Sequence, residues 1–138
     1  MITVMMSGHF DPLHDMHLDY IKQAKDFGDY LVCVVSSDKQ LLLKKGKVNI
    51  PEQGRVEIAT LILKGLGIKG RVVLNIFDTE TTLVAKALQC VKPDVFCRGG
   101  DKKLGDMPIE EQRVCKDLNI EVQHAKFYED RHGSRMML

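Results

Sequence analysis

The 138-residue chain has little of what marks several classes of protein. It has no tryptophan, only four prolines and no excess of one charge, since 20 basic residues face 19 acidic ones. Surfaces that bind nucleic acid usually show a strong basic excess, so a net charge of +1 argues against such a partner. No linker, low-complexity tract or repeat interrupts the chain, which predicts a single domain over residues 1–138.

Cysteine and long apolar runs are also scarce. The four cysteines are widely spaced and form no C-x-x-C pair, which predicts free, mostly buried thiols in a reducing compartment. The apolar stretch 1–6 is too short for a signal peptide or a membrane span. We therefore expect a cytoplasmic protein that does not bind a membrane. Its 44% of apolar residues is enough for a substantial core and excludes disorder.

Short apolar segments alternate with helical periodicity along the chain. The pattern predicts strands at residues 2–6, 30–35, 71–77, 94–97 and 120–122. It predicts helices at about 14–27, 38–43, 51–66, 83–91 and 108–118. This alternation indicates an α/β protein, a Rossmann-like three-layer α/β/α arrangement around a five-stranded parallel sheet. In such sheets ligands bind beyond the carboxyl ends of the strands, where the strand order reverses.

The segment that follows the first strand, residues 7–17, carries three of the five histidines. Gly8 allows a tight turn and leaves room for a ligand. His14 and His17 are three residues apart in the first helical turn, so their rings project from one side of the helix. The helix N-terminus adds unpaired N–H groups and partial positive charge. Together these groups suit stabilisation of charge in phosphoryl or nucleotidyl transfer.

Other interpretations of these residues stay open. A histidine at a helix start is often only a cap, and His9, His14 and His17 together could bind zinc, although the phosphate hypothesis also uses the helix terminus. The Lys44–Lys47 run is equally typical of a solvated loop. Arg55 could be an exposed helix residue or an ion-pair partner in a pocket.

Residues 8–17, Gly-His-Phe-Asp-Pro-Leu-His-Asp-Met-His, resemble the G-x-F-D-x-x-H-x-G-H signature of the cytidylyltransferase-like nucleotidyltransferases. Three later segments are similar to the same template, in order: residues 35–38, residues 44–55 with their basic loop, and the Arg98–Asp101 turn. The likeness covers nearly the whole chain. It is nearest to the heptose-1-phosphate adenylyltransferase and glycerol-3-phosphate cytidylyltransferase types, in a group that also includes archaeal FAD synthetases.

The resemblance implies a reaction between a nucleoside triphosphate, CTP or ATP, and a small phosphorylated acceptor, with release of pyrophosphate. The acceptor phosphate attacks the α-phosphorus in line, so catalysis consists mainly of positioning and charge neutralisation. The resemblance also implies Mg²⁺ across the phosphates and a homodimer.

The same resemblance assigns roles to particular residues. The catalytic group would be His14, His17, Lys45 and Lys47. The nucleotide would be bound by Gly8, His9, Phe10, Asp11, Arg98, Gly99, Gly100, Asp101, Arg131 and Ser134. The acceptor would be bound by Lys45 and Arg55, and Mg²⁺ by Asp11.

Two departures from the family pattern matter. Met16 replaces the penultimate glycine of the signature, which predicts altered placement of the nucleotide. Near the C-terminus, residues 130–135 supply Arg131, Ser134 and Arg135 in place of the expected phosphate-binding segment, and a disordered tail is the alternative. These departures support a second hypothesis, a catalytically impaired nucleotide-binding module of the same fold. A metal-dependent enzyme using the histidines is a third.

Overall fold

Five strands form one all-parallel sheet in the computed structural model, which describes residues 1–99 and 106–126. In the order β3-β2-β1-β4-β5, the strands are Gly70–Leu74, Tyr30–Val35, Thr3–Gly8, Val95–Arg98 and Glu121–His124. Every neighbouring pair is parallel. The predicted Rossmann-like α/β fold is confirmed.

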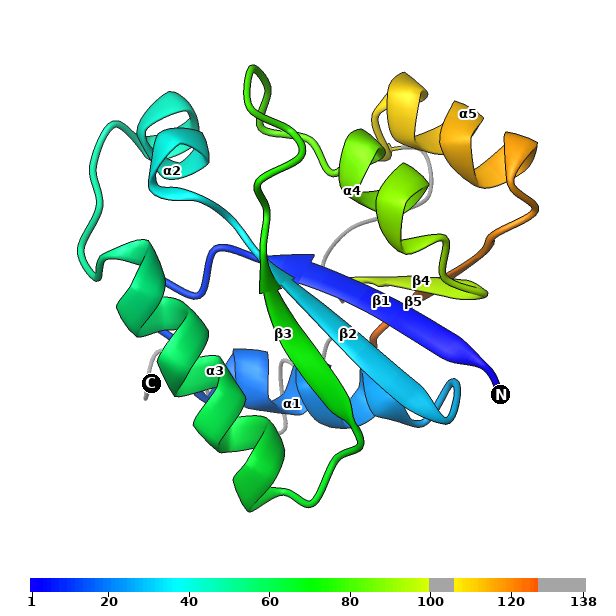
Figure 1. The fold of residues 1–138 in the computed structure, drawn as a ribbon, viewed down its shortest axis with the longest axis horizontal. Helices are drawn as coiled ribbons and strands as arrows, with labels where there is room; N and C mark the ends of the chain where they lie inside the picture. Colours follow the sequence, from blue (N-terminus) through cyan, green and yellow to red (C-terminus); the bar gives the residue numbers. More distant parts are fainter. Residues whose placement is uncertain (100–105, 127–138) are drawn as a thin grey trace.

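Helices cover both faces of this sheet (Figure 1). Helices α1 (Asp15–Lys25) and α3 (Glu52–Gly65) lie on one face, and α4 (Ala85–Val91) and α5 (Ile109–Asp117) lie on the other. The short helix α2 (Asp38–Lys45) follows the carboxyl end of β2. Successive side chains of a strand point to opposite faces of the sheet, so the side chains of β1 pack into two separate cores. This explains why the sequence of β1 is continuously apolar.

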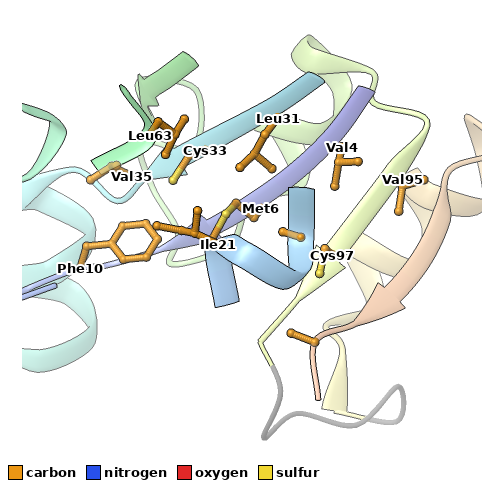
Figure 2. Packing of buried hydrophobic residues seen from close by; sticks show 12 residues of the cluster. Val4, Met6, Phe10, Ile21, Leu31, Cys33, Val35, Leu63, Val95 and Cys97 are labelled. Carbon is orange, nitrogen blue, oxygen red and sulfur yellow. The ribbon is translucent and has the colours of Figure 1, made fainter. Parts of the chain in front are cut away.

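The core under α1 and α3 contains Val4 and Met6 from β1, packed against Ile21 of α1 and Leu63 of α3 (Figure 2). Met5, which points to the other face, packs with residues of α4 and α5. Three cysteines, Cys33, Cys97 and Cys115, are buried, Cys90 is exposed, and all four are free, as predicted. Within the described part of the chain, no helix is both long and apolar enough to cross a membrane.

Side-chain contacts explain where elements differ from the expected bounds. The third strand ends at Leu74 because the Asn75 Oδ1 accepts the N–H groups of Phe77 and Asp78, which turns the chain. Helix α4 begins at Ala85, and the Asp78 carboxylate accepts two N–H groups of its first turn. Helix α2 extends through Lys45 and ends at Gly46, whose φ of 78° is left-handed, so the predicted loop begins later than expected.

The strand order reverses between β1 and β4, which lie side by side although they are far apart in sequence. The chain leaves β1 toward β2 and β3 and then crosses to β4 on the other side. Loops that follow β1 and β4 therefore diverge at the carboxyl edge of the sheet, where α/β proteins bind their ligands. This topology confirms that the first strand borders the point where the strand order reverses.

One fold prediction concerns Gly70, where β3 approaches β2. A Cβ at this position would overlap the carbonyl oxygen of Leu31. We expect Gly70→Ala to lower the free energy of unfolding by about 3 kcal/mol, measured by urea denaturation, because backbone must shift. Gly65→Ala is the control, since a Cβ at Gly65 meets no atom within 4 Å, and it should be neutral or stabilise by up to about 1 kcal/mol. Equal effects of the two substitutions would contradict the close approach.

Candidate active site

A cleft of about 510 Å³ opens at the carboxyl ends of β1 and β4. Nine residues predicted from the sequence line it: Gly8, His9, Phe10, Asp11, His14, His17, Lys45, Arg98 and Gly99. Lys47 is exposed and does not line the cleft. Gly100, Asp101, Arg131, Ser134 and Arg135 lie outside the described residues. The structure thus gathers most of the predicted group at one edge of the sheet.

His14 and His17 form a reciprocal cap at the start of α1. The Nδ1 of His14 accepts the N–H of Met16 at 3.2 Å, and the Nδ1 of His17 accepts the N–H of His14 at 3.2 Å. This is the capping-box arrangement, with histidines in place of the usual Ser/Thr and Glu/Gln. The two rings stack with centroids 4.1 Å apart and an interplanar angle of 27°. The predicted placement of the pair on one side of the helix is confirmed.

The environment of His17 keeps its ring neutral at pH 7. The ring is half-buried and meets Phe10 edge-on, with centroids 4.9 Å apart. Burial lowers the pKa of His17 to about 4, helped by the nearby charges of His14, Lys45 and His9. An imidazole in this state stabilises a phosphoryl oxygen by donating a hydrogen bond, without contributing a net charge.

The pKa of His17 predicts how stability depends on pH. In the unfolded chain this histidine takes up its proton near its ordinary pKa of 6.5, but in the folded protein only near 4. The unfolded state therefore binds more protons between these values, and the free energy of unfolding falls as the pH drops through that window. His17→Gln removes this contribution, so its unfolding free energy should fall less between pH 7 and pH 5 in urea titrations. If the unfolding free energies of the wild type and His17→Gln change with pH in the same way, the pKa of His17 is not lowered in the folded protein.

Tyr20 joins the helix to both strands at the mouth of the cleft. Its hydroxyl donates to the carbonyl of Cys97 in β4 and accepts the N–H of Ser7 in β1 at 3.4 Å. Burial raises the pKa of Tyr20 well above its ordinary value, so the hydroxyl keeps its proton. Tyr20 was not predicted from the sequence as a site residue, although it lies one helical turn after His17 and shares its face.

The side chain of Phe10, rather than a bound ligand, occupies the space above Gly8. A Cβ at Gly8 would lie 2.8 Å from the ring Cζ of Phe10. Phe10 has a φ of 53° and is 1% exposed, and Figure 2 shows its ring directed toward Met6 and Ile21. This corrects the expectation that Gly8 leaves room for a ligand: the glycine makes room for the core side chain that anchors the loop.

Asp11 holds the loop between α2 and α3. Its Oδ2 accepts the N–H of Asn49 at 2.8 Å and its Oδ1 accepts the N–H of Ile50 at 2.6 Å. Burial opposes ionisation, but these two N–H groups and the charges of Arg55 and Lys45 lower the pKa of Asp11 below its ordinary value. The carboxylate is therefore ionised and already engaged on both oxygens, each of which keeps a further lone pair.

The histidines do not form a metal site. Across residues 1–99 and 106–126, no three His, Cys, Asp or Glu side chains are grouped so that they could hold a metal ion. The zinc hypothesis for His9, His14 and His17 therefore has no geometric support. His9 instead contacts the Oγ of Ser36 through its Nδ1, at 2.7 Å.

Another wall of the cleft is the loop between β3 and α4. Gln40 of α2 donates both amide hydrogens to this loop, to the carbonyls of Thr81 and Leu83 at 3.0 and 2.8 Å. Glu111 of α5 accepts the N–H of Val84 at 3.0 Å. Residues 82–84 and Glu111 line the cleft, but none of them was predicted from the sequence, because their positions depend on two other helices.

Met16 does not obstruct the cleft. Its side chain is half-buried, and it is not among the residues that line the cavity. Its backbone N–H donates to the Nδ1 of His14, which caps the helix. The residue that replaces the signature glycine is therefore not part of the cleft wall, and its effect on the placement of the nucleotide stays a prediction.

Arg55 corrects the prediction of an acceptor-binding residue. Its side chain is fully buried, and it does not line the cleft. Its guanidinium donates to the carbonyls of Ile50, His9 and Ser36 at 2.7–2.8 Å and pairs with Asp38 at 2.8 Å. Four of its five N–H donors are thus used inside the protein, so Arg55 positions three loops and cannot reach a substrate.

Removal of this arginine should be costly. We expect Arg55→Met to lower the free energy of unfolding by about 3 kcal/mol, because buried carbonyls and Asp38 lose their partner. Arg71→Met is the matched control, because Arg71 is exposed on β3, and it should change stability by less than about 0.5 kcal/mol. Urea denaturation measures both. Similar values for the two variants would rule out the buried network as a source of stability.

Comparison with known proteins gives a consistent set of relatives. A family model described as Cytidylyltransferase-like matches residues 5–134. The FAD synthase of Aciduliprofundum boonei is 30% identical over 140 residues, which cover 100% of this chain and 89% of that protein. The bifunctional protein HldE of Shewanella denitrificans is 34% identical over 120 residues, 87% of this chain but 24% of that protein. The chain thus spans about a quarter of the bifunctional relatives.

Solved structures show the same architecture. The lipopolysaccharide core biosynthesis protein of Thermoplasma volcanium matches with a TM-score of 0.68 and 28% identity, over 93% of this chain and 98% of that one. A pantoate-beta-alanine ligase of Francisella tularensis matches with a TM-score of 0.64 over 96% of this chain and 62% of that one. At 16% identity, the second match shows the fold alone.

Proposed function

The chain belongs to the cytidylyltransferase-like family and is a nucleotidyltransferase, and from this premise we propose that it transfers the adenylyl group of ATP to a small phosphorylated acceptor. The observation that carries the proposal is the pair of stacked histidines at the start of α1, in a cleft at the strand-order reversal. A helix N-terminus with imidazole N–H donors beside it suits a triphosphate better than a metal or a hydroxyl substrate.

The names of the relatives support ATP as the donor and a flavin phosphate as the first acceptor to test. Two FAD synthases align with most of their own length, 89% for A. boonei and 78% for Thermococcus sibiricus. FAD consists of an adenylyl group joined to FMN, so such an enzyme needs ATP and FMN. The resemblance of the sequence to heptose-1-phosphate adenylyltransferases makes a sugar phosphate the second acceptor class to test.

The residues of the cleft supply positioning and charge stabilisation. His14 and His17 would donate hydrogen bonds to phosphoryl oxygens as negative charge develops on them, and Lys45 at the end of α2 would neutralise charge from across the cleft. The acceptor phosphate forms a bond to the α-phosphorus as the bond to the β-phosphate oxygen breaks, and pyrophosphate leaves. Mg²⁺, when bound, would screen the phosphates, held mostly by them and by a remaining lone pair of Asp11.

Purified protein supplied with ATP, Mg²⁺ and FMN should release pyrophosphate and form FAD. Chromatography measures the FAD, and a coupled assay measures the pyrophosphate. His17→Ala should lower the rate about a hundredfold or more, because it removes a donor to the transition state. Lys45→Ala should lower the rate as well, whereas Lys64→Ala, an exposed lysine on α3, is its matched control and should not.

Two outcomes would redirect the proposal. Turnover with CTP but not ATP, or with a sugar phosphate but not FMN, would change the donor or the acceptor. Nucleotide binding in a thermal-shift screen without pyrophosphate release from any acceptor would favour the non-catalytic nucleotide-binding module. The screen should compare ATP, CTP, GTP and UTP, with and without Mg²⁺.

A further inference from the structure

We propose that the hydroxyl of Tyr20 replaces one hydrogen bond between β1 and β4 and holds these two strands apart, so that Tyr20 is a positioning residue that sets the width of the cleft. The separation of the strands rests on contacts within the free protein. Its effect on the rate of nucleotidyl transfer rests on the proposed function.

Strand β1 pairs with its two neighbours over different lengths. With β2 the pairing covers all six residues of β1. With β4 the pairing stops at Met5 and Phe96, although β1 continues to Gly8 and β4 continues to Arg98. The sheet therefore splits between β1 and β4 at its carboxyl edge. Residues from both strand ends line the cleft, so the cleft opens at this split.

The next hydrogen bond between the two strands would join Ser7 to Cys97. In a parallel pair, an N–H that faces the neighbouring strand donates to the carbonyl of the residue that precedes its partner. Continuation of the observed register would pair Ser7 with Arg98, so the N–H of Ser7 would donate to the carbonyl of Cys97. Instead, the Tyr20 hydroxyl accepts the N–H of Ser7 at 3.4 Å and donates to the carbonyl of Cys97. Two hydrogen bonds through a side chain thus take the place of one between the strands.

The surroundings of Tyr20 fix its hydroxyl in this position. Its ring packs against the core that lies under α1 and α3. Burial raises the pKa of Tyr20 well above its ordinary value, so the hydroxyl keeps the proton that it donates. Cys97 is buried, and a buried carbonyl without a donor is destabilising. If the hydroxyl were removed, the carbonyl would therefore need another donor, and the nearest candidate is the N–H of Ser7.

Tyr20 connects the two sides of the cleft. His17 lies one turn earlier on α1, and Arg98 directly follows the carbonyl that Tyr20 binds. Both side chains line the cleft, His17 from the segment that follows β1 and Arg98 from β4. Closure of the split would therefore move Arg98 relative to the helix that carries His17. A displacement of about 1 Å at a site of this kind can lower a rate about a hundredfold.

Scalar coupling across hydrogen bonds tests the separation of the strands in the free protein by NMR. In the ¹⁵N,¹³C-labelled wild type, we expect no coupling between the amide nitrogen of Ser7 and the carbonyl carbon of Cys97, because a hydroxyl lies between them. In Tyr20→Phe the two groups should bond directly, so the coupling should appear. The bonds between β1 and β2 give the reference signal in both proteins. A coupling in the wild type, or none in Tyr20→Phe, would overturn the proposal.

Steady-state kinetics test the positioning role. Tyr20→Phe should lower kcat about tenfold or more and change the KM for ATP by less than about threefold, because closure of the split disturbs alignment in the transition state more than binding. Tyr30→Phe is the matched control. It removes a tyrosine hydroxyl at the start of β2, outside the cleft, and should leave both constants unchanged.

The two experiments separate the possible failures. An unchanged kcat in folded Tyr20→Phe would show that the hydroxyl contributes only to stability, which would overturn the positioning role. If the wild type itself shows no turnover with any acceptor, the proposed function fails. The coupling experiment needs no substrate, so it still decides whether Tyr20 holds β1 and β4 apart.

Discussion

The buried guanidinium of Arg55 is the interaction on which the geometry of the site depends. Three loops that converge at the carboxyl edge of the sheet each present a backbone carbonyl to it, and Asp38 balances its charge. Backbone carbonyls this deep need a donor, because an unpaired buried polar group is destabilising. One planar side chain with five donors satisfies several of them at once, in a fixed relative orientation.

Asp11 completes this arrangement from the other side. It binds the N–H groups of Asn49 and Ile50, while Arg55 binds the carbonyl of Ile50, so the loop before α3 is held through both kinds of backbone group. The loop after β1 is anchored at the same time by Phe10, whose ring fills the space over Gly8. The histidines therefore stand on a rigid base, which preorganised donors require if they are to stabilise developing charge.

A near-zero net charge is compatible with binding a triphosphate because the groups that would contact the phosphates are concentrated in one cleft. Two imidazoles, a helix N-terminus and the lysines at the end of α2 meet at one cleft, where an overall basic surface is unnecessary. The half-buried, neutral ring of His17 also avoids the cost of desolvating a charge before the ligand arrives.

Local sequence was sufficient to predict the alternation of strands and helices, because periodicity and capping residues act over a few positions. The strand at 30–35 matches its predicted bounds, since it is continuous, apolar and β-branched. The gathering of His14 and His17 at the sheet edge also followed from the sequence, through their spacing and the parallel topology. The roles of Gly8, Asp11 and Arg55 did not. Each depends on partners brought close by folding, such as His9, 46 residues from Arg55, and Asn49, 38 residues from Asp11. Sequence spacing carries no record of such contacts, so only the tertiary structure decided which polar residues hold the cleft together and which face into it.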